Sequence, residues 1–340
     1  MTTTTNRQVR LRRRPVGAPR LDDFEIAEGP VPSPGEGEVL SRTIYLSLDP
    51  YMRGRISGVR SYAAGVDIGQ VIVGGTVGEV VQSRHPGFAP GDMVATAAGW
   101  QEYGVAKGAT LRKLDPAQVP LSTALGVLGM PGLTAYVGLL DIGRPRAGET
   151  VVVSAASGAV GAVVGQIAKI KGCRVVGVAG AAEKCAYVVS ELGFDACVSH
   201  REPLGPVLGQ ACPRGIDVYF DNVGGPTLAA VLGLINVNAR IPLCGMISEY
   251  NATEPPSGPN LRPLLFNRAL IKGFIISDHL DRMGDFLTDC SRWLREGQLK
   301  YREDVVHGLD HAPAAFIGLL EGKNFGKLIV QVGTDPTRRS

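Results

Sequence analysis

A run of small residues between positions 154 and 161 could bind a phosphate group. It follows a stretch of β-branched residues, precedes a stretch of helical length and fits A-x-x-G-x-x-G, a relaxed form of the dinucleotide fingerprint. Small residues let the backbone turn tightly and approach a pyrophosphate, while the following helix supplies free amides. We therefore expect Gly158, Ala159, Val160 and Gly161 to bind the pyrophosphate of a nicotinamide dinucleotide. The alternative is a glycine-rich turn without a ligand.

The residues after the next expected strand indicate which dinucleotide is bound. Enzymes that use NAD usually carry an acidic residue there, which binds the ribose 2′-hydroxyl. Here the strand tip is Gly180-Ala181, and Glu183 comes one or two positions late, where it would favour the first turn of a helix. Lys184 could reach a 2′-phosphate, or it could be a solvated helix lysine. The absence of a carboxylate at the tip favours NADPH over NADH.

Other common catalytic patterns are absent from the sequence. A catalytic zinc needs three clustered ligands, but the first 125 residues hold one histidine, His85, and no cysteine, and the other histidines are scattered. Neither the G-x-S-x-G elbow nor a P-loop is present. The six cysteines form no Cys-x-x-Cys pair, which indicates reduced thiols in a cytoplasmic protein. Hydride transfer by a bound nicotinamide, without a metal, is the remaining chemistry.

These residues belong to a region in which apolar runs alternate with helical stretches. Strands that are buried on both faces and separated by helices predict a doubly wound parallel sheet in an α/β fold. The predicted strands span 150–156, 174–179, 196–199, 216–220, 239–244 and 270–276, and the predicted helices span 160–171, 182–192, 228–235 and 281–296.

The first 125 residues have a different sequence pattern from the α/β region. Short strand-like segments at 38–46, 71–81 and 93–95 are separated by glycine and proline, which predicts a small β-rich domain of barrel or sandwich type. The tail after Tyr301 is irregular and ends in a predicted strand at 327–332. A chain of 340 residues favours two domains.

Composition restricts the class of partner. The chain is 44% hydrophobic and 20% charged, and its formal net charge is +3. Such a balance predicts a soluble globular protein with neither a nucleic-acid nor a membrane partner, and the apolar runs are too short to span a bilayer. The N-terminus has no apolar core of the kind found in a secretory signal.

Seven short motifs, taken together, resemble the zinc-independent branch of the medium-chain dehydrogenase/reductases. This branch includes the leukotriene/prostaglandin reductases, the plant alkenal double-bond reductases and bacterial curcumin reductase. Each motif alone is unspecific, but their order covers nearly the whole chain. They are LDPYMRG at 48–54, GMPGLTAY at 129–136, AASGAVG at 155–161, AGAAEK at 179–184, YFDNVGG at 219–225, CGMISEYN at 244–251 and GKNFGK at 322–327.

The resemblance implies an architecture and an activity. It implies a GroES-like β-rich substrate domain over 1–130, a Rossmann NADP-binding domain over 131–300 and a C-terminal return to the substrate domain over 301–340. It further implies NADPH-dependent reduction of the carbon–carbon double bond of α,β-unsaturated aldehydes and ketones, usually by a homodimer.

The resemblance also assigns residues to the cofactor. Gly158 to Gly161 would bind the pyrophosphate, and Lys184 beside Gly180 would bind the 2′-phosphate. Relatives often have tyrosine where this chain has His200, which could assist the phosphate when protonated or merely cap the strand. Residues expected around the adenosine, nicotinamide and ribose groups are Asn222, Cys244, Gly245, Met246, Ile247, Ser248, Tyr250, Phe274, Ile275, Ile276, Ser277 and Asn324.

Reduction of an enone requires a proton donor as well as a hydride. Addition to the β-carbon leaves an enolate, whose oxygen needs a hydrogen-bond donor. Tyr250 is the first candidate, although its phenol could instead only organise the nicotinamide ribose. Tyr51 could be a wall of the substrate pocket or a buried core tyrosine, and Tyr62 and Met130 are further pocket candidates. A quinone reductase of the same architecture and a non-catalytic NADPH-binding protein remain as alternatives.

Overall fold

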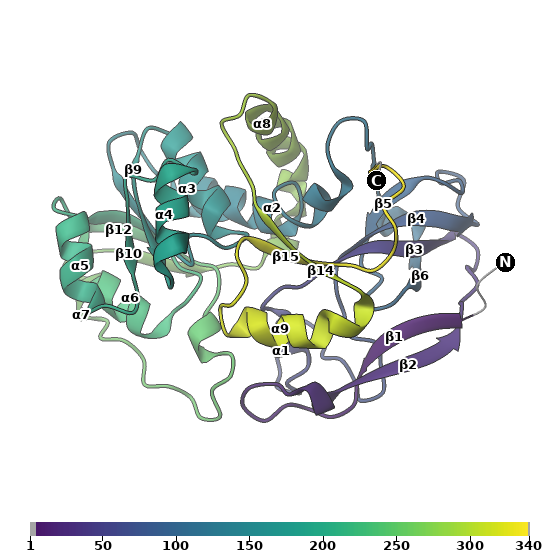
Figure 1. Cartoon of the computed structure of the whole chain (residues 1–340). Helices are drawn as coiled ribbons and strands as arrows, with labels where there is room; N and C mark the ends of the chain where they lie inside the picture. The colour runs from purple at the N-terminus through teal and green to yellow at the C-terminus, as the bar shows by residue number, and fades with distance from the viewer. Residues whose placement is uncertain (1–4, 339–340) are drawn as a thin grey trace. The chain divides into compact units, whose positions relative to one another are not determined.

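The computed structural model describes residues 5–338, which form two compact units (Figure 1). Among the described residues, the first unit contains 5–125, Glu303–Asn324 and 328–338. The second unit contains Gly126–Arg302 and Phe325–Lys327. No helix among the described residues is long and apolar enough to cross a membrane.

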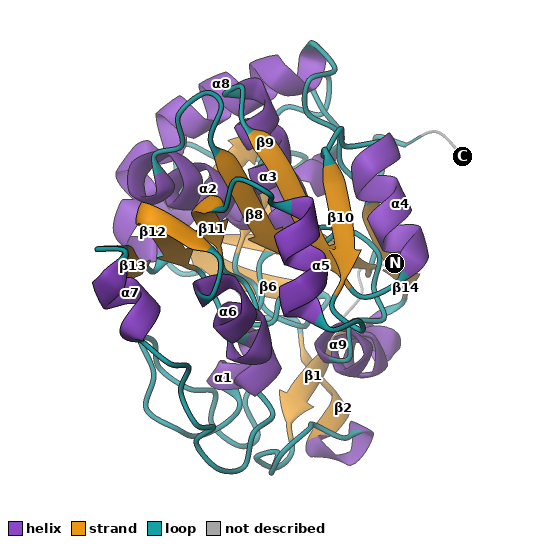
Figure 2. Ribbon diagram, turned by 90° about the vertical axis from the view of Figure 1, so that its left-hand side faces the viewer, coloured by secondary structure: helices purple, strands orange, loops and turns teal. Residues whose placement is uncertain are grey.

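The second unit is built on a six-stranded parallel sheet (Figure 2). Its first two βα units extend the sheet in one direction and the later ones in the other, which is the order of a doubly wound fold. The prediction of a Rossmann-like α/β unit is therefore confirmed. Across the sheet the strands are β10 (Ala196–Ser199), β9 (Arg174–Ala179), β8 (Thr150–Ser154), β11 (Ile216–Phe220), β12 (Ile235–Leu243) and β13 (Leu270–Gly273).

Helices cover both faces of this sheet. Right-handed crossovers place α3 and α4 on one face and α5, α6 and α7 on the other, and α2 packs against α3 and α8. The helices are α2 (Met130–Val137), α3 (Gly161–Ile170), α4 (Ala182–Ser190), α5 (Leu204–Ala211), α6 (Gly225–Leu232), α7 (Arg262–Phe266) and α8 (Met283–Arg295), with a π-helix at Gly138–Gly143 and 3-10 helices at Ile247–Glu249 and Ile276–Arg282.

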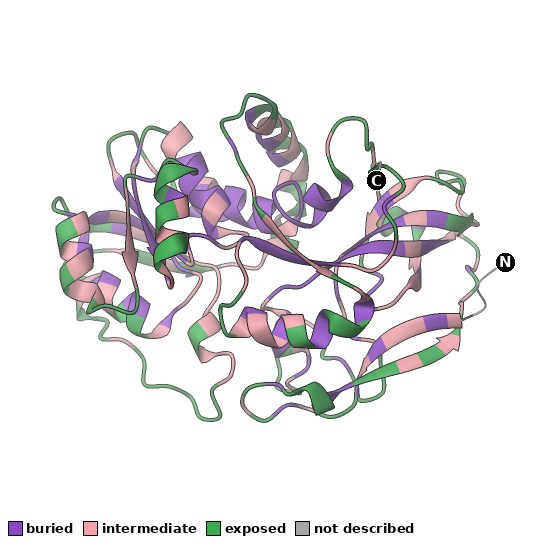
Figure 3. Ribbon diagram, in the orientation of Figure 1, coloured by how far each residue is buried: buried purple, intermediate pink, exposed green. Residues whose placement is uncertain are grey.

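The central strands are the core of this unit. Val151, Val152 and Val153 of β8 are completely buried, in agreement with a strand covered on both faces. Buried residues of both units are purple in Figure 3. On the face of α5, α6 and α7, the apolar side chains of β8, β9 and β11 pack in one cluster with those of the helices. The continuous β-branched run in the sequence thus forms the most buried strand.

Some predicted boundaries are wrong. The helix predicted at 228–235 starts at Gly225 and ends at Leu232, and Ile235 instead begins β12 and pairs with Ile216. A proline in the first turn starts the helix early, and the chain turns into the strand after Gly233. Helices α2, α5 and α7 were not predicted from the sequence.

The first unit is mostly antiparallel, so the prediction of a β-rich unit is confirmed. Its larger sheet has the order β14-β15-β3-β4-β5-β7, and β6 also pairs with β3. Strands β1 and β2 form a separate two-stranded sheet. The strands are β1 (Thr5–Leu11), β2 (Phe24–Pro30), β3 (Glu38–Ser47), β4 (Thr76–Ser83), β5 (Met93–Thr96), β6 (Tyr103–Lys107), β7 (Arg112–Leu114), β14 (Glu303–His307) and β15 (Lys327–Gln331), and the helices are α1 (Met52–Arg55), α9 (Ala312–Leu320) and four 3-10 turns at Leu21–Asp23, Gly108–Thr110, Leu121–Leu125 and Leu309–His311.

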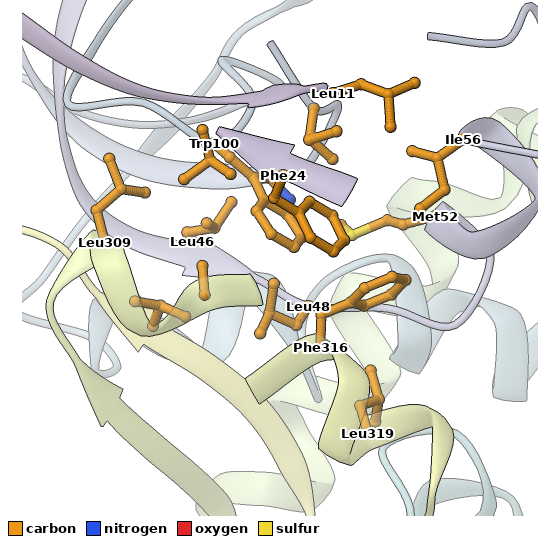
Figure 4. Packing of buried hydrophobic residues seen from close by; sticks show 14 of the residues in the cluster. Leu11, Phe24, Leu46, Leu48, Met52, Ile56, Trp100, Leu309, Phe316 and Leu319 are labelled. Carbon is orange, nitrogen blue, oxygen red and sulfur yellow. The ribbon is translucent and has the colours of Figure 1, made fainter. Parts of the chain in front are cut away.

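Aromatic packing joins the beginning and the end of the chain in the first unit (Figure 4). The rings of Phe24 and Trp100 stack with centroids 5.9 Å apart, and Phe316 of α9 meets Trp100 edge-on at 5.6 Å. All three side chains are almost fully buried. Helix α9, which lies in the last part of the chain, is therefore part of this unit's core.

Candidate functional site

The predicted cofactor residues of the second unit follow the ends of parallel strands. The carboxyl ends of parallel strands share one edge of a sheet, and ligands of doubly wound folds bind there, where the strand order reverses. In this sheet the reversal lies between β8 and β11. The predicted residues follow β8 (158–161), β9 (Gly180, Lys184), β10 (His200), β11 (Asn222), β12 (244–248, Tyr250) and β13 (Phe274, Ile275, Ile276, Ser277).

The turn after β8 presents backbone amides. Ala155 has a φ of +49°, and its carbonyl oxygen accepts a hydrogen bond from the Gly158 N–H at 2.9 Å. A Cβ on Gly161 would lie 2.4 Å from the same oxygen, so only glycine fits there. Gly158 forms a parallel bridge with Gly326, and the N–H groups of Val160 and Gly161 make no main-chain hydrogen bond among residues 5–338. Together with the N-terminus of α3, they form a cradle suited to a phosphate.

His200 and Gly180 lie together at the tips of β10 and β9. The backbone N–H of His200 donates to the Ala179 carbonyl at 3.0 Å, and its Nε2 lies 2.8 Å from where a Cβ on Gly180 would be. Lys184 is half-buried in the first turn of α4, which starts two residues after Gly180. The imidazole therefore covers the same strand tip from which α4 begins.

Asp221, which was not predicted from the sequence, has a completely buried side chain at the end of β11. One carboxylate oxygen accepts hydrogen bonds from the Tyr219 hydroxyl at 2.7 Å and from the N–H groups of Val223 and Gly224, both at 2.9 Å. The Asp221 main-chain carbonyl accepts the Cys244 N–H at 2.8 Å. Asp221 therefore fixes the loops that follow β11 and β12. Its only signal in the sequence was its place in the motif at 219–225.

We expect Asp221→Leu to lower the free energy of unfolding by about 1–3 kcal/mol, since it leaves buried donors without an acceptor. Asp221→Asn is the matched control, because its amide oxygen can still accept those hydrogen bonds and the loss should be smaller. Urea denaturation of both variants measures the effect. Equal stability of the leucine variant and the wild type would contradict it.

Tyr250 lies against the loop that follows β12. Its hydroxyl oxygen accepts the Met246 N–H at 3.4 Å and is 3.0 Å from where a Cβ on Gly245 would be. The same loop is tied to the one after β11, because the Ser248 hydroxyl donates to the Val223 carbonyl at 2.6 Å. The Tyr250 phenol is thus held close to the backbone of 245–246.

Asn222 and Cys244, two of the predicted cofactor residues, lie in the loops that follow β11 and β12. The Asn222 side-chain amide donates to the Ser154 carbonyl at 2.8 Å, which links the end of β11 to the end of β8. Burial, with a contribution from Asp221, raises the pKa of the Cys244 thiol to about 12. Cys244 is therefore a neutral thiol at neutral pH and is unsuited to nucleophilic chemistry.

The segment after β13 is anchored by aromatic contacts. The Phe274 ring meets Phe220 edge-on at a centroid distance of 6.3 Å and His279 at 6.4 Å. Gly138 leaves space for both phenylalanine rings, since a Cβ there would lie 2.6 Å from each. Ile275 and Ile276 are half-buried, and Ser277 is exposed.

The predicted substrate residues are divided between the units. Tyr51 and Tyr62 belong to the first unit and Met130 to the second, where its carbonyl accepts the Thr134 hydroxyl at 2.7 Å. Burial raises the pKa of Tyr51, the Asp49 carboxylate adds to the effect and Arg55 opposes it. Tyr62 is 58% exposed. Asn324 also belongs to the first unit, at the residue before the chain enters the second.

Two family models match the chain. One, described as the N-terminal domain of oxidoreductase, covers residues 7–114, and the other, described as zinc-binding dehydrogenase, covers residues 159–290. Within residues 5–338, no group of three or more His, Cys, Asp or Glu side chains is placed so that it could hold a metal ion.

Individual proteins match over nearly the full length. The NADPH-dependent curcumin reductase of Escherichia coli (strain K12) is 54% identical, over 97% of this chain and 98% of that protein. The 2-alkenal reductase (NADP(+)-dependent) of Nicotiana tabacum is 41% identical, over 97% and 98%. The crystal structure of CurA in complex with NADPH from Vibrio vulnificus has a TM-score of 0.92 and 50% identity, over 97% of this chain and 100% of that one. This chain therefore belongs to the medium-chain dehydrogenase/reductase family, in the branch that contains the curcumin and 2-alkenal reductases.

Proposed function

We propose that this protein uses NADPH to reduce the carbon–carbon double bond of α,β-unsaturated aldehydes and ketones. The observation that carries this function is the glycine turn after β8, which lies at the strand where the order of the sheet reverses and leads into the N-terminus of α3. Its relatives of 54% and 41% identity are named as NADPH- or NADP-dependent reductases. When bound, NADPH supplies the hydride that adds to the β-carbon.

The second unit fits this cofactor. The amides of 159–161 would bind the pyrophosphate, and Lys184, with His200 beside Gly180, would bind the 2′-phosphate. We propose that Asn222, the loop at 244–250, the segment at 274–277 and Asn324 bind the remaining parts of the dinucleotide. The absence of an acidic residue at the tip of β9 supports a 2′-phosphate over a free hydroxyl.

We propose that tyrosine side chains orient the enone. The first unit would act as the substrate domain, and Tyr51, Tyr62 and Met130 are the residues proposed to contact the substrate. A tyrosine is protonated at neutral pH and burial raises the pKa of Tyr51 further, so its phenol can donate to a carbonyl oxygen. Tyr250 would donate to the enolate oxygen, since its phenol is held in place by the Met246 amide.

Tyr250→Phe is expected to lower kcat about 10-fold, as one hydrogen bond to developing negative charge is worth roughly 1.4 kcal/mol or more. The affinity for NADPH should change much less. Tyr103→Phe, in β6 of the first unit, is the control. An unchanged kcat in the Tyr250 variant would rule out an essential phenolic proton.

A substrate panel tests the proposed activity. Purified protein and NADPH are mixed with an alkenal, an enone or a quinone, and the decrease in the near-ultraviolet absorbance of NADPH is followed. We expect consumption with the alkenal and the enone, and a product in which the carbonyl group remains. Consumption with the quinone alone would favour a quinone reductase, and binding without turnover would indicate a non-catalytic NADPH-binding protein.

We also propose that the protein is a homodimer. An apolar patch on the second unit supports this, because Leu261, Leu265 and Phe266 are 59%, 74% and 67% exposed in and beside α7. Adjacent exposed apolar residues of this size are typical of protein interfaces. Sedimentation velocity should give twice the mass of the chain, and a monomer would contradict the proposal.

A cytoplasmic location is the last part of the proposal. All six cysteines are free thiols, and three of them, Cys173, Cys212 and Cys290, are buried. Reduced cysteines are typical of the cytosol. Fractionation of cells that produce the protein tests this location.

A further inference from the structure

The chain leaves the second unit after Arg302 and re-enters it for three residues, Phe325–Lys327. These three residues run beside the glycine turn, where Gly326 forms a parallel bridge with Gly158. We infer that Arg302 is a positioning residue, which holds this re-entering segment against the turn and so keeps the turn in its phosphate-binding shape. The inference rests on the proposed binding of a dinucleotide at that turn.

The backbone of Arg302 makes the first contact. Its carbonyl oxygen accepts the Lys327 N–H at 2.9 Å. Gly326 has a φ of +91°, and a Cβ there would lie 2.3 Å from the same carbonyl oxygen. This close approach is possible only with glycine. Main-chain contacts alone thus hold Arg302 next to residues 326 and 327.

The side chain of Arg302 makes the second contact. Its guanidinium carbon lies 4.2 Å from the centre of the Phe325 ring and 6.0 Å from that of Tyr187. The two rings meet edge-on at 5.1 Å. A guanidinium within about 6 Å of an aromatic centroid is attracted by the ring quadrupole. The arginine therefore joins Phe325 to the ring of Tyr187 in one cluster.

This cluster connects the segment to a second part of the proposed site. Tyr187 lies in α4, three residues after Lys184, and side chains with that spacing share one side of a helix. The re-entering segment is consequently fixed on one side to α4, which carries the proposed 2′-phosphate ligand. On its other side it borders Gly158.

A glycine turn benefits from such an external support. It has few side chains to restrict its conformation, and ordering flexible residues upon binding costs affinity. A neighbouring segment that holds the turn before the ligand arrives lowers this cost. The pyrophosphate is common to NADPH and NADH, so the support should serve both dinucleotides equally.

The sequence gives no sign of this role, since Arg302 follows the last helix of the second unit and is exposed as a whole residue. Only the fold brings Phe325 back under its guanidinium.

Arg302→Met tests the inference, with binding of NADPH and of NADH measured by nucleotide fluorescence in the absence of an enone. We expect both affinities to fall by a similar factor, about two- to fivefold, which is the effect of losing one exposed cation–π contact. Arg302→Lys keeps the cation and should recover part of the affinity. Arg292→Met, which removes a similar cation 5.9 Å from the Trp293 ring, should leave both affinities unchanged.

A double-mutant cycle separates positioning from a general loss of stability. In a Phe325→Leu background the arginine loses its ring contact with the re-entering segment and keeps only the more distant Tyr187 ring, so Arg302→Met should then have little further effect on NADPH affinity. Melting temperatures of all variants are measured alongside. The inference is overturned if Arg302→Met leaves the affinity unchanged, or if it lowers the affinity equally in both backgrounds. Wild-type protein that binds no NADPH would instead overturn the proposed function, so the two failures are distinguishable.

Discussion

Gly161→Ala is expected to lower the affinity for NADPH about 100-fold, the largest effect that we predict for a single substitution in this protein. The added methyl group would lie 2.4 Å from the Ala155 carbonyl oxygen and 2.9 Å from its carbonyl carbon. The clash is with backbone, which cannot rotate away as a flexible side chain would. To relieve it, the turn must move the carbonyl that now accepts the Gly158 N–H. That movement would misplace the amides of 159–161.

Fluorescence titration with NADPH measures the effect, and Gly209→Ala provides the control. Gly209 lies inside α5, and a Cβ there would meet only the Leu234 side chain at an ordinary 3.7 Å. This substitution should leave NADPH binding intact and stabilise the helix by about 0.5–1 kcal/mol. Wild-type affinity in the Gly161 variant would show that the turn is not the phosphate-binding element.

Lys184→Gln should weaken NADPH about 10- to 100-fold while changing the affinity for NADH little. A hydrogen bond to a charged group is worth about 1.5–3 kcal/mol, and the 2′-phosphate is the only group by which the two dinucleotides differ. Lys184 is well placed for this role, because it lies in the first turn of α4 after the strand tip at Gly180. Gly180 also borders the His200 imidazole, which would add a donor when protonated.

The ratio of the NADPH and NADH dissociation constants is the quantity to measure. Lys184→Arg keeps the charge and should retain most of the preference for NADPH. Lys171→Gln removes a charge just after the end of α3 and should not alter the ratio. Equal losses for both dinucleotides in the Lys184→Gln variant would discard its role at the 2′-phosphate. Such equal losses are expected for Arg302 variants instead, so the two sites can be told apart.

The sequence by itself determined the local elements of the second unit. Continuous β-branched runs predict strands covered on both faces, and β8, β9, β10 and β11 lie close to their predicted positions. The glycine turn could be predicted as well, because its chemistry depends on adjacent residues and on the strand and helix that flank them. Seven motifs in one order were then enough to recognise the family. Local periodicity did not fix the end of α6, where Ile235 joins a strand because its partner Ile216 is there.

Only the tertiary structure decided which distant residues support the site. β15 pairs with β3 through residues such as Ile329 and Ser47, so the last part of the chain completes the sheet of the first unit. Asp221 accepts hydrogen bonds from the loops after β11 and β12 because the ends of these two strands are adjacent. Arg302 met Phe325 because the chain returns to the second unit there. Contacts of this kind depend on long-range burial and chain return, and neither leaves a periodic pattern in the sequence.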